Sequence, residues 1–320
     1  MALSGSVNFN MNAKQLIEAA FGLIGVKKME QPLQAAELQD GLNTLNLMLK
    51  SWQAQGMHLW KEEEAVLFLN VGQPEYTIGP AGDHCCAVDD FVGSTTSAAI
   101  LSGVTVIPMT DTIGMQAGDN VGIALGNGQS GERFWTTIVS VDSLTQITIT
   151  DAVTDDCDSG NSVYTYTALL NRPLRILSYR RKIFEQDNDI TVPAWSRDQY
   201  FNQVNKLSQG TVVNAYYSPQ LTNGKLYVWQ TASQATQLLR FTYEDPINDI
   251  DNDTNDLDIP VEWLETVQYN LAARLCDTYD VPMEKVQTVG SKAALFLDNL
   301  LGFDQEMTSI NVRPYAEGYS

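Results

Sequence analysis

The sequence predicts an α+β protein in which helices from the two ends of the chain form one bundle that carries a β ribbon and a small inserted all-β domain. Three observations support this prediction. Apolar residues recur at helical spacing near both ends, and short β-branched runs separated by Gly, Asp, Asn and Ser fill the middle. The 320 residues also exceed the size of about 250 residues at which a single core stops growing, so more than one domain is expected.

Residues 12–55 are typical of two amphipathic helices. Asn12 can cap the first helix and Gly25 can end it, while Pro32 precedes the second. The apolar stripes comprise Leu16, Ile17, Ala20, Phe21 and Ile24 in the first helix, and Leu38, Leu42, Leu45, Leu49 and Trp52 in the second. Such one-sided stripes must pack on each other and on further elements, which predicts a helical bundle.

From Glu64 the period becomes that of strands, with two runs around the turn at Gln73 and Pro74. Residues 85–167 then hold ten acidic side chains against one basic side chain, Arg133. The β-branched runs of this stretch, among them NVGIAL, RFWTTIVSV and SVYTYT, are separated by turn residues. This pattern predicts an inserted antiparallel barrel or sandwich.

After the insertion the pattern of the first segment returns. LRILSYRRKI and QLLRFTY predict strands, and TVVNAYY and KLYVWQT predict a hairpin whose tight turn is Asn223-Gly224. Helical spacing resumes at Pro260, and a last helix is expected from about Glu284 to its stop at Gly302. The predicted organisation is a core formed by residues 1–84 and 168–302, an inserted β domain of residues 85–167, and an extended tail of residues 303–320.

The charge of the chain restricts its function. Thirty-nine acidic residues against nineteen basic ones give a net charge of −20, the wrong sign for binding nucleic acid through bulk charge. No apolar run of about 18 residues predicts a membrane span, and the first residues lack the basic and apolar regions of a secretory signal. Four cysteines without a CxxC spacing are typical of a reducing cytoplasm.

Patterns that suggest ligands or catalysis fail on their context. The GxGxxG at residues 126–131 is followed by a β-branched strand where a phosphate-binding helix is required, so we interpret it as a hairpin loop. His84, Cys85, Cys86 and Cys157 lack the spacing of zinc ligands. With two histidines in the chain and no GxSxG, hydrolytic catalysis is not supported. We therefore expect no enzyme activity, no cofactor and no metal.

An acidic run at residues 249–258 precedes the helix at Pro260. Counted from Asp251, its side chains have the spacing of a calcium loop, but Asp256 stands where the sharp turn needs Gly. A solvated acidic loop beside a helix N-terminus is favoured, and a structural cation is the alternative.

Two phrases carry a family resemblance. They are MLKSWQAQGMHLW, within residues 45–60, and IPVEWLETVQYNLAARL, at residues 259–275. Together with KQLIEAAFGLIGV, and in this order around a β ribbon, they resemble the head-to-tail adaptor (head completion, DNA stabilisation) proteins of short-tailed bacteriophages. The resemblance covers about residues 12–78 and 174–301. The stretch 85–167 departs from it, since the shortest family members lack it, and its phrases resemble SH3-like or immunoglobulin-like modules.

The resemblance implies a structural virion protein, made in the host cytoplasm, that forms a ring below the portal, most often a dodecamer. Such a ring seals the packaged DNA and provides the platform for tail or nozzle proteins, and no membrane takes part. DNA would pass through the channel without specific binding. An acidic wall suits such a conduit, because it does not hold a polyanion.

The same resemblance suggests interfaces. In a ring, Arg180 and Arg181 of the basic strand are expected to meet the acidic run of the adjacent protomer, and a solvated strand face is the alternative. The C-terminal segment of such adaptors commonly reaches along the portal. The predicted portal and subunit interface comprises Arg180, Arg181, Phe303, Ile310, Val312, Arg313 and Tyr315, and the predicted tail-facing hairpin comprises Asn223 and Gly224.

Two other classes remain as alternatives. A tail-associated cell-wall hydrolase or carbohydrate-binding protein would bind cell-wall sugars through the acidic β insertion. A hydrolase of this kind would use a pair of carboxylates, since Asp and Glu are plentiful. A capsid decoration protein is the third possibility, and it would not bind portal rings.

Overall fold

The computed structural model describes residues 5, 8–27, 32–57, 59–126, 132–183, 186 and 188–303 of the protein. The chain divides into two compact units. The helical unit comprises residues 1–61 and 247–320, and the β unit comprises residues 62–246.

The prediction of a helical bundle with a β ribbon and a small inserted domain is wrong. The protein is mostly β, with 31% strand and 27% helix, and the strands of the described residues form four sheets. The physical reason lies in the strands outside residues 85–167. They form sheets that share a hydrophobic core of their own, and Val66, Phe68 and Leu238 are buried in a further core.

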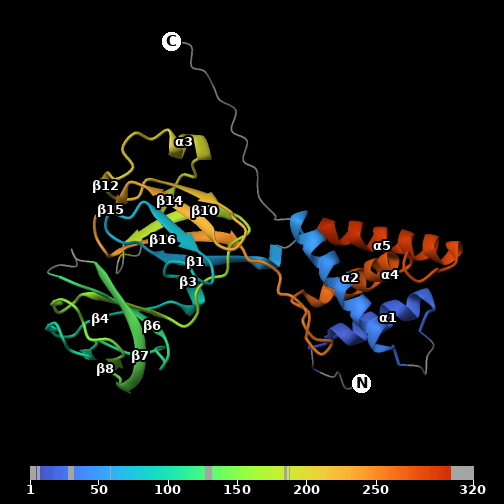
Figure 1. Ribbon diagram of the computed structural model, residues 1–320, viewed down its shortest axis with the longest axis horizontal. Helices are drawn as coiled ribbons and strands as arrows, with labels where there is room; N and C mark the ends of the chain where they lie inside the picture. The colour runs from blue at the N-terminus through green and yellow to red at the C-terminus, as the bar shows by residue number, and fades with distance from the viewer. Residues whose placement is uncertain are drawn as a thin grey trace, which may run out of the picture. The chain divides into compact units, whose positions relative to one another are not determined.

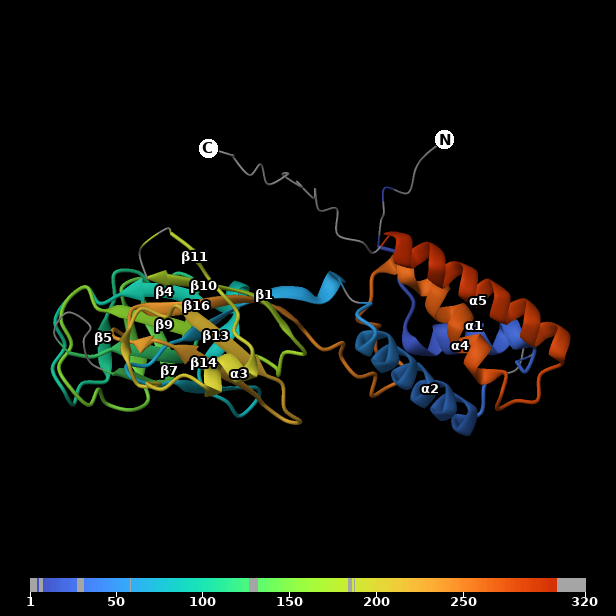
Figure 2. The same ribbon diagram turned by 90° about the horizontal axis from the view of Figure 1, so that it is seen from above.

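The helical unit is built from helices of both ends of the chain, which pack side by side (Figures 1 and 2). They are α1 (Ala13–Ile24), α2 (Ala35–Ala54), the 3₁₀ turn η1 (Leu59–Lys61), the 3₁₀ turn η4 (Val261–Trp263), α4 (Leu264–Leu275) and α5 (Met283–Phe303). The apolar stripes of α1, α2 and α4 meet in one core. Most of the stability of these helices comes from this shared burial.

The helix signals of the sequence act as predicted in α1. The Asn12 side chain accepts a hydrogen bond from the backbone N–H of Gln15 (2.9 Å), and the backbone N–H of Asn12 donates to the side-chain oxygen of Gln15 (3.2 Å). Gly25 ends the helix at a φ of 81°, a left-handed conformation that glycine adopts without strain. Gly302, in contrast, does not stop the last helix, since α5 continues to Phe303.

The middle layer of the β unit is an antiparallel sheet with the order β11-β10-β16-β1-β3. Its strands are β1 (Glu62–Phe68), β3 (Cys85–Ala87), β10 (Ile176–Ile183), β11 (Ile190–Val192) and β16 (Gln237–Glu244). Along β1, Ala65 and Leu67 enter one core, while Val66 and Phe68 enter another. Because side chains alternate along a strand, one layer packs on each face of this sheet.

One outer layer is a sheet of three strands in the order β13-β14-β2. They are β2 (Glu75–Ile78), β13 (Asn214–Ser218) and β14 (Gly224–Trp229); the short helix α3 (Arg197–Phe201) and the strand pair β12 (Gln209–Gly210) and β15 (Thr231–Ala232) lie beside them (Figure 1). The inner faces of this sheet and the middle sheet share a core.

The tight turn predicted at Asn223-Gly224 is wrong. β13 and β14 pair as predicted, but residues 219–223 connect them, and Gly224 is the first residue of β14, opposite Ile78. A Cβ atom on Gly224 would clash with the ring and hydroxyl of Tyr217. Close packing in the sheet, not a left-handed turn, therefore explains the glycine.

The other layer is a curled half-barrel with the strand order β4-β9-β6-β7-β8-β5. Its strands are β4 (Val92–Thr95), β5 (Val106–Pro108), β6 (Asn120–Ala124), β7 (Arg133–Ser143), β8 (Gln146–Ile149) and β9 (Ser162–Tyr166). Its two edges approach each other through a backbone bridge between Thr96 and Met109. β6 and β7 pair antiparallel, which confirms that the GxGxxG connects a hairpin, although residues 127–131 lie outside the described residues.

Aromatic side chains join the half-barrel to the middle sheet. The ring of Phe68 in β1 lies 5.2 Å from that of Trp135, 5.4 Å from that of Tyr164 and 5.7 Å from that of Tyr166. Stacks of this kind add about 0.5–1.5 kcal/mol each beyond the area they bury. The acidic stretch is thus packed into the β unit and shares its interior.

Candidate functional site

The two phrases that carry the family resemblance meet at Trp263. This side chain, in η4, is 2% exposed and belongs to the second phrase. The rings of Trp60 in η1 and Trp52 in α2, both from the first phrase, lie 4.6 Å and 5.8 Å from it. The matching residues, far apart in sequence, therefore form one aromatic centre in the core of the helical unit.

The acidic run at residues 249–258 is neutralised from within the helical unit. Lysines from α1, α2 and η1 reach three of its carboxylates. The ion pairs are Lys14–Asp253 (3.6 Å), Lys50–Asp249 (2.7 Å) and Lys61–Asp258 (3.0 Å). Backbone N–H groups at the start of α1 also donate to its carbonyls, Ala13 to Asn255 and Lys14 to Asp253. The run thus joins α1, α2 and η1 to the segment that leads into η4.

Asn46 of α2 holds the start of this run in place. Its side-chain amide donates to the carbonyl of Ile250 and accepts from the N–H of the same residue, both at 3.0 Å. The amide thereby substitutes for a backbone partner. Lys50, one turn later, donates to the carbonyl of Ile247 at 2.5 Å. These contacts satisfy backbone groups of an irregular segment that forms neither a helix nor a strand.

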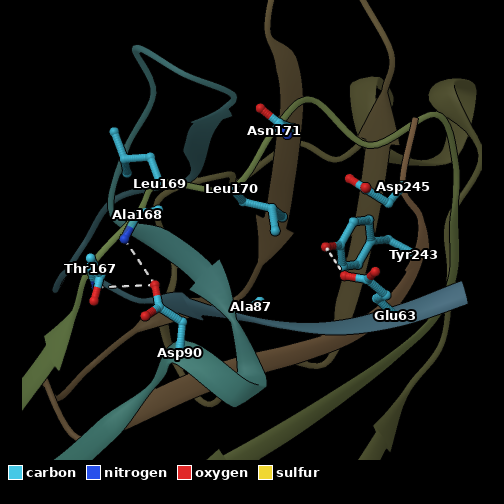
Figure 3. Close-up of a pocket in the computed structure, with 10 residues that line it drawn as sticks. All are labelled: Glu63, Ala87, Asp90, Thr167, Ala168, Leu169, Leu170, Asn171, Tyr243 and Asp245. Atoms are coloured by element: carbon cyan, nitrogen blue, oxygen red, sulfur yellow. Dashed lines mark hydrogen bonds between the residues drawn. The ribbon is translucent and has the colours of Figure 1, made fainter. Parts of the chain in front are cut away.

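The β unit carries a pocket of about 330 Å³ where β1 begins and β16 ends (Figure 3). Its lining comprises Glu63, Ala87, Asp90, Thr167, Ala168, Leu169, Leu170, Asn171, Tyr243 and Asp245. A neighbouring pocket of about 470 Å³ shares Glu63 and Ala87 with it, and is completed by Glu62, Glu64, Val88 and Asp89. We call the two pockets together the acidic hollow, because six carboxylates are among the residues that line them.

Contacts within the chain engage at least three of these carboxylates: Glu63, Asp90 and, through Arg180, Glu64. The hydroxyl of Tyr243 donates to Glu63 (3.1 Å), and burial raises the pKa of this tyrosine, so the hydroxyl keeps its proton. Asp90, in the 3₁₀ turn η2 (Val88–Asp90), accepts the backbone N–H groups of Thr167 (3.0 Å) and Ala168 (2.9 Å). Figure 3 shows both arrangements along the rim of the pocket. Asp90 therefore fixes the segment that follows β9.

The basic strand is paired within the β unit. Arg180 of β10 forms an ion pair with Glu64 of β1 and donates to the hydroxyl of Thr242 (3.2 Å). Arg181 donates to the carbonyl of Val212 (3.2 Å). That Arg180 and Arg181 contact the adjacent protomer stays a prediction. In such an interface, their guanidinium groups would have to keep the contacts within the β unit and also bind the neighbour's carboxylates.

The remaining predicted interface residues belong to other parts of the chain. Asn223 and Gly224 lie at the start of β14, where Asn223 lies against Gly79. Phe303 ends α5 in the helical unit. Ile310, Val312, Arg313 and Tyr315 lie outside the described residues.

The cysteine and histidine pattern forms structural contacts. His84 stacks on Trp135 with ring centroids 3.7 Å apart and hydrogen-bonds to the hydroxyl of Tyr166 (2.5 Å). Cys85 and Cys86 point into different cores, and burial raises the pKa of both thiols. In the ranges that the structure describes, no group of His, Cys, Asp or Glu side chains could hold a metal ion.

Sequence reasoning missed an aromatic surface on the outer layer. Tyr216 and Tyr227 stack across β13 and β14 with ring centroids 5.7 Å apart, and Tyr200 of α3 packs 4.8 Å from Tyr227. The signal was present in the alternation of β14, where Leu226 and Val228 are buried and Tyr227 faces outward. No sequence pattern predicts the acidic hollow, because the residues that line it come from separate parts of the sequence.

Comparison with known proteins adds no identification. No protein-family description matches the chain, and no curated protein matches it. Among the described residues, no helix has the length and apolar character needed to cross a membrane.

Proposed function

We propose that this chain is a non-enzymatic head-to-tail adaptor of a short-tailed phage virion. It would form a ring below the portal, seal the packaged genome and carry the tail or nozzle proteins. DNA would pass through its channel without specific binding. Its partners would be further copies of itself, the portal protein and tail components, and its place the head-tail junction.

The observation that carries the proposal is the meeting of the two resembling phrases around Trp263. Phrases matched by chance would have no reason to share a core, whereas these supply Trp52, Trp60 and Trp263 to one aromatic centre. The net charge of −20 also supports a conduit, since an acidic channel wall lets a polyanion slide.

The contacts of the acidic hollow do not favour the hydrolase alternative. Glu63 and Asp90 accept hydrogen bonds from the protein itself, as structural carboxylates do. A glycosidase needs two carboxyl groups that flank a substrate and exchange protons with it. Clearing of purified cell walls by this chain would favour the alternative.

The test is made on particles assembled without this chain. They are expected to package DNA and then lose it, and to lack tails, and the wild-type chain supplied in trans should restore both properties. Trp263→Ala should not restore them, whereas Leu47→Ala, a change at an exposed position of α2, should. Particles that keep their genomes and acquire tails without the chain would contradict the proposal.

A further inference from the structure

An exposed apolar knob projects from the outer layer of the β unit, next to the aromatic surface. We define it as residues 197–207, which comprise α3 and the segment after it. Three of its side chains are apolar and exposed: Phe201 by 46%, Val204 by 99% and Leu207 by 67%. An isolated exposed apolar residue is ordinary, but three within seven positions form a patch of the kind that marks interaction sites.

The knob has a defined shape because it is fastened to the sheet beneath. Tyr200 is buried against Tyr227, with ring centroids 4.8 Å apart. The indole N–H of Trp229 donates to the carbonyl of Asn205 (2.9 Å). A partner would therefore meet a surface that is already ordered, which lowers the entropic cost of binding.

The knob carries two cations, Arg197 and Lys206, against one carboxylate, Asp198, so its net charge is +1 in a strongly acidic chain. Arg197 lies over the ring of Phe201, 5.4 Å from its centroid, and Lys206 donates to the carbonyls of Phe201 and Gln203. Neither cation has a carboxylate partner within the part of the chain that the structure describes. The knob thus combines exposed apolar side chains with positive charge.

The acidic hollow has the complementary properties. It is concave, and its lining combines the apolar residues Ala87, Val88 and Leu170 with carboxylates such as Glu62 and Asp89. A convex apolar surface with cations at its edge fits a concave apolar surface with anions at its edge.

We propose that the knob of one copy of this chain inserts into the acidic hollow of a second copy. This contact rests on the proposed adaptor function and names the surfaces by which neighbouring subunits of its ring would join. It uses two different surfaces, so it repeats from copy to copy and closes a ring where the rotation permits. The exposed aliphatic side chains favour a protein partner over single-stranded nucleic acid, because Val204 and Leu207 offer no π face to a base.

The test is sedimentation velocity of the full-length chain over a range of concentrations. The wild type is expected to self-associate, and less so as salt rises. Two variants test the contact: a knob-reversed variant (Arg197→Glu with Lys206→Glu) and a hollow-reversed variant (Glu62→Lys with Asp89→Lys). Each should need an about tenfold or more higher protein concentration than the wild type to associate to the same extent, which corresponds to loss of one favourable charge contact. A mixture of the two variants should associate like the wild type, because each reversed surface then meets its complement.

The mixture also excludes misfolding as the cause, since two misfolded chains would not rescue each other. Asp155→Lys with Asp298→Lys is the matched control: it reverses two exposed carboxylates that do not line the hollow, and should leave association unchanged. A wild type that stays monomeric at hundreds of micromolar, a reversed variant that associates normally, or a mixture that fails to recover would overturn the proposal. So would knob-dependent binding of a single-stranded oligonucleotide without self-association.

These results separate the two proposals. Self-association is measured without portals or particles, whereas the adaptor function is measured by genome retention and tail attachment. Association without any effect on particles would contradict the function alone, and normal complementation by the reversed variants would contradict this contact alone.

Discussion

The ring of Trp263 lies edge-on to that of Trp60, with their centroids 4.6 Å apart. One residue is in the turn that precedes α4 and the other in the turn that precedes β1, so this contact joins the two halves of the chain that build the helical unit.

Replacement of Trp263 by alanine should destabilise the helical unit by about 3–5 kcal/mol, since it removes a buried aromatic side chain and leaves a cavity. Urea unfolding followed by circular dichroism at helical wavelengths measures this loss. Trp263→Phe, which keeps an aromatic ring, should cost less, and Leu47→Ala at an exposed position should be nearly neutral. Equal midpoints for Trp263→Ala and the wild type would contradict the assignment of Trp263 to the core.

Asn46→Ala should cost about 1–3 kcal/mol, because it leaves both backbone groups of Ile250 without their partner in a half-buried place. Hydrogen exchange should speed up most at residues 248–252. Asn43, on the same helix, is exposed and provides the control, since Asn43→Ala should change neither stability nor exchange there. Unchanged exchange at Ile250 in Asn46→Ala would show that the amide does not hold the segment.

His84 should make the β unit less stable in mild acid. Burial lowers the pKa of this histidine to about 4, whereas an unfolded histidine titrates near 6.5. Between these values the unfolded chain binds the additional proton, so stability is complete above about pH 6.5 and falls as the pH drops towards 4. His84→Phe keeps a ring against Trp135 and should flatten this fall, measured as urea midpoints at neutral and mildly acidic pH. Parallel pH profiles for the two proteins would contradict it.

Calcium should not stabilise the protein through the acidic run. Lys14, Lys50 and Lys61 already form ion pairs with three of its five carboxylates, and a calcium ion that used these three would have to displace the lysines. Thermal unfolding in millimolar calcium should therefore match that in magnesium or in chelator. A rise in the melting temperature with calcium alone would favour the cation.

The local structure followed from local patterns. The cap at Asn12, the stop at Gly25 and the runs that became β6, β7 and β9 are all set by neighbours within a few residues. The fold class was mispredicted because the partner of a buried face is not a local property. Residues 65–68 of β1 are a continuous apolar run, which indicates burial on both faces, but the run does not identify the layers that bury it.

The candidate surfaces depend even more on distant pairing. Glu63 and Asp245 line one pocket because β1 pairs with β16, and Asp90 joins them through its bonds to residues 167 and 168. The number of charged residues follows from the sequence. The clustering of carboxylates in a hollow and the exposure of Val204 depend on how the three layers pack, which the sequence does not show.

The pairing of β1 with β16 has one more consequence. Glu62 lies opposite Glu244, so the polypeptide enters and leaves the β unit at neighbouring points. A segment with adjacent ends is a self-contained cassette: it can be spliced into a host loop, or excised and replaced by a short bridge from Lys61 to Ile247, without rerouting the rest of the chain. This architecture would allow the helical unit to be conserved in evolution while the cassette that it carries is exchanged.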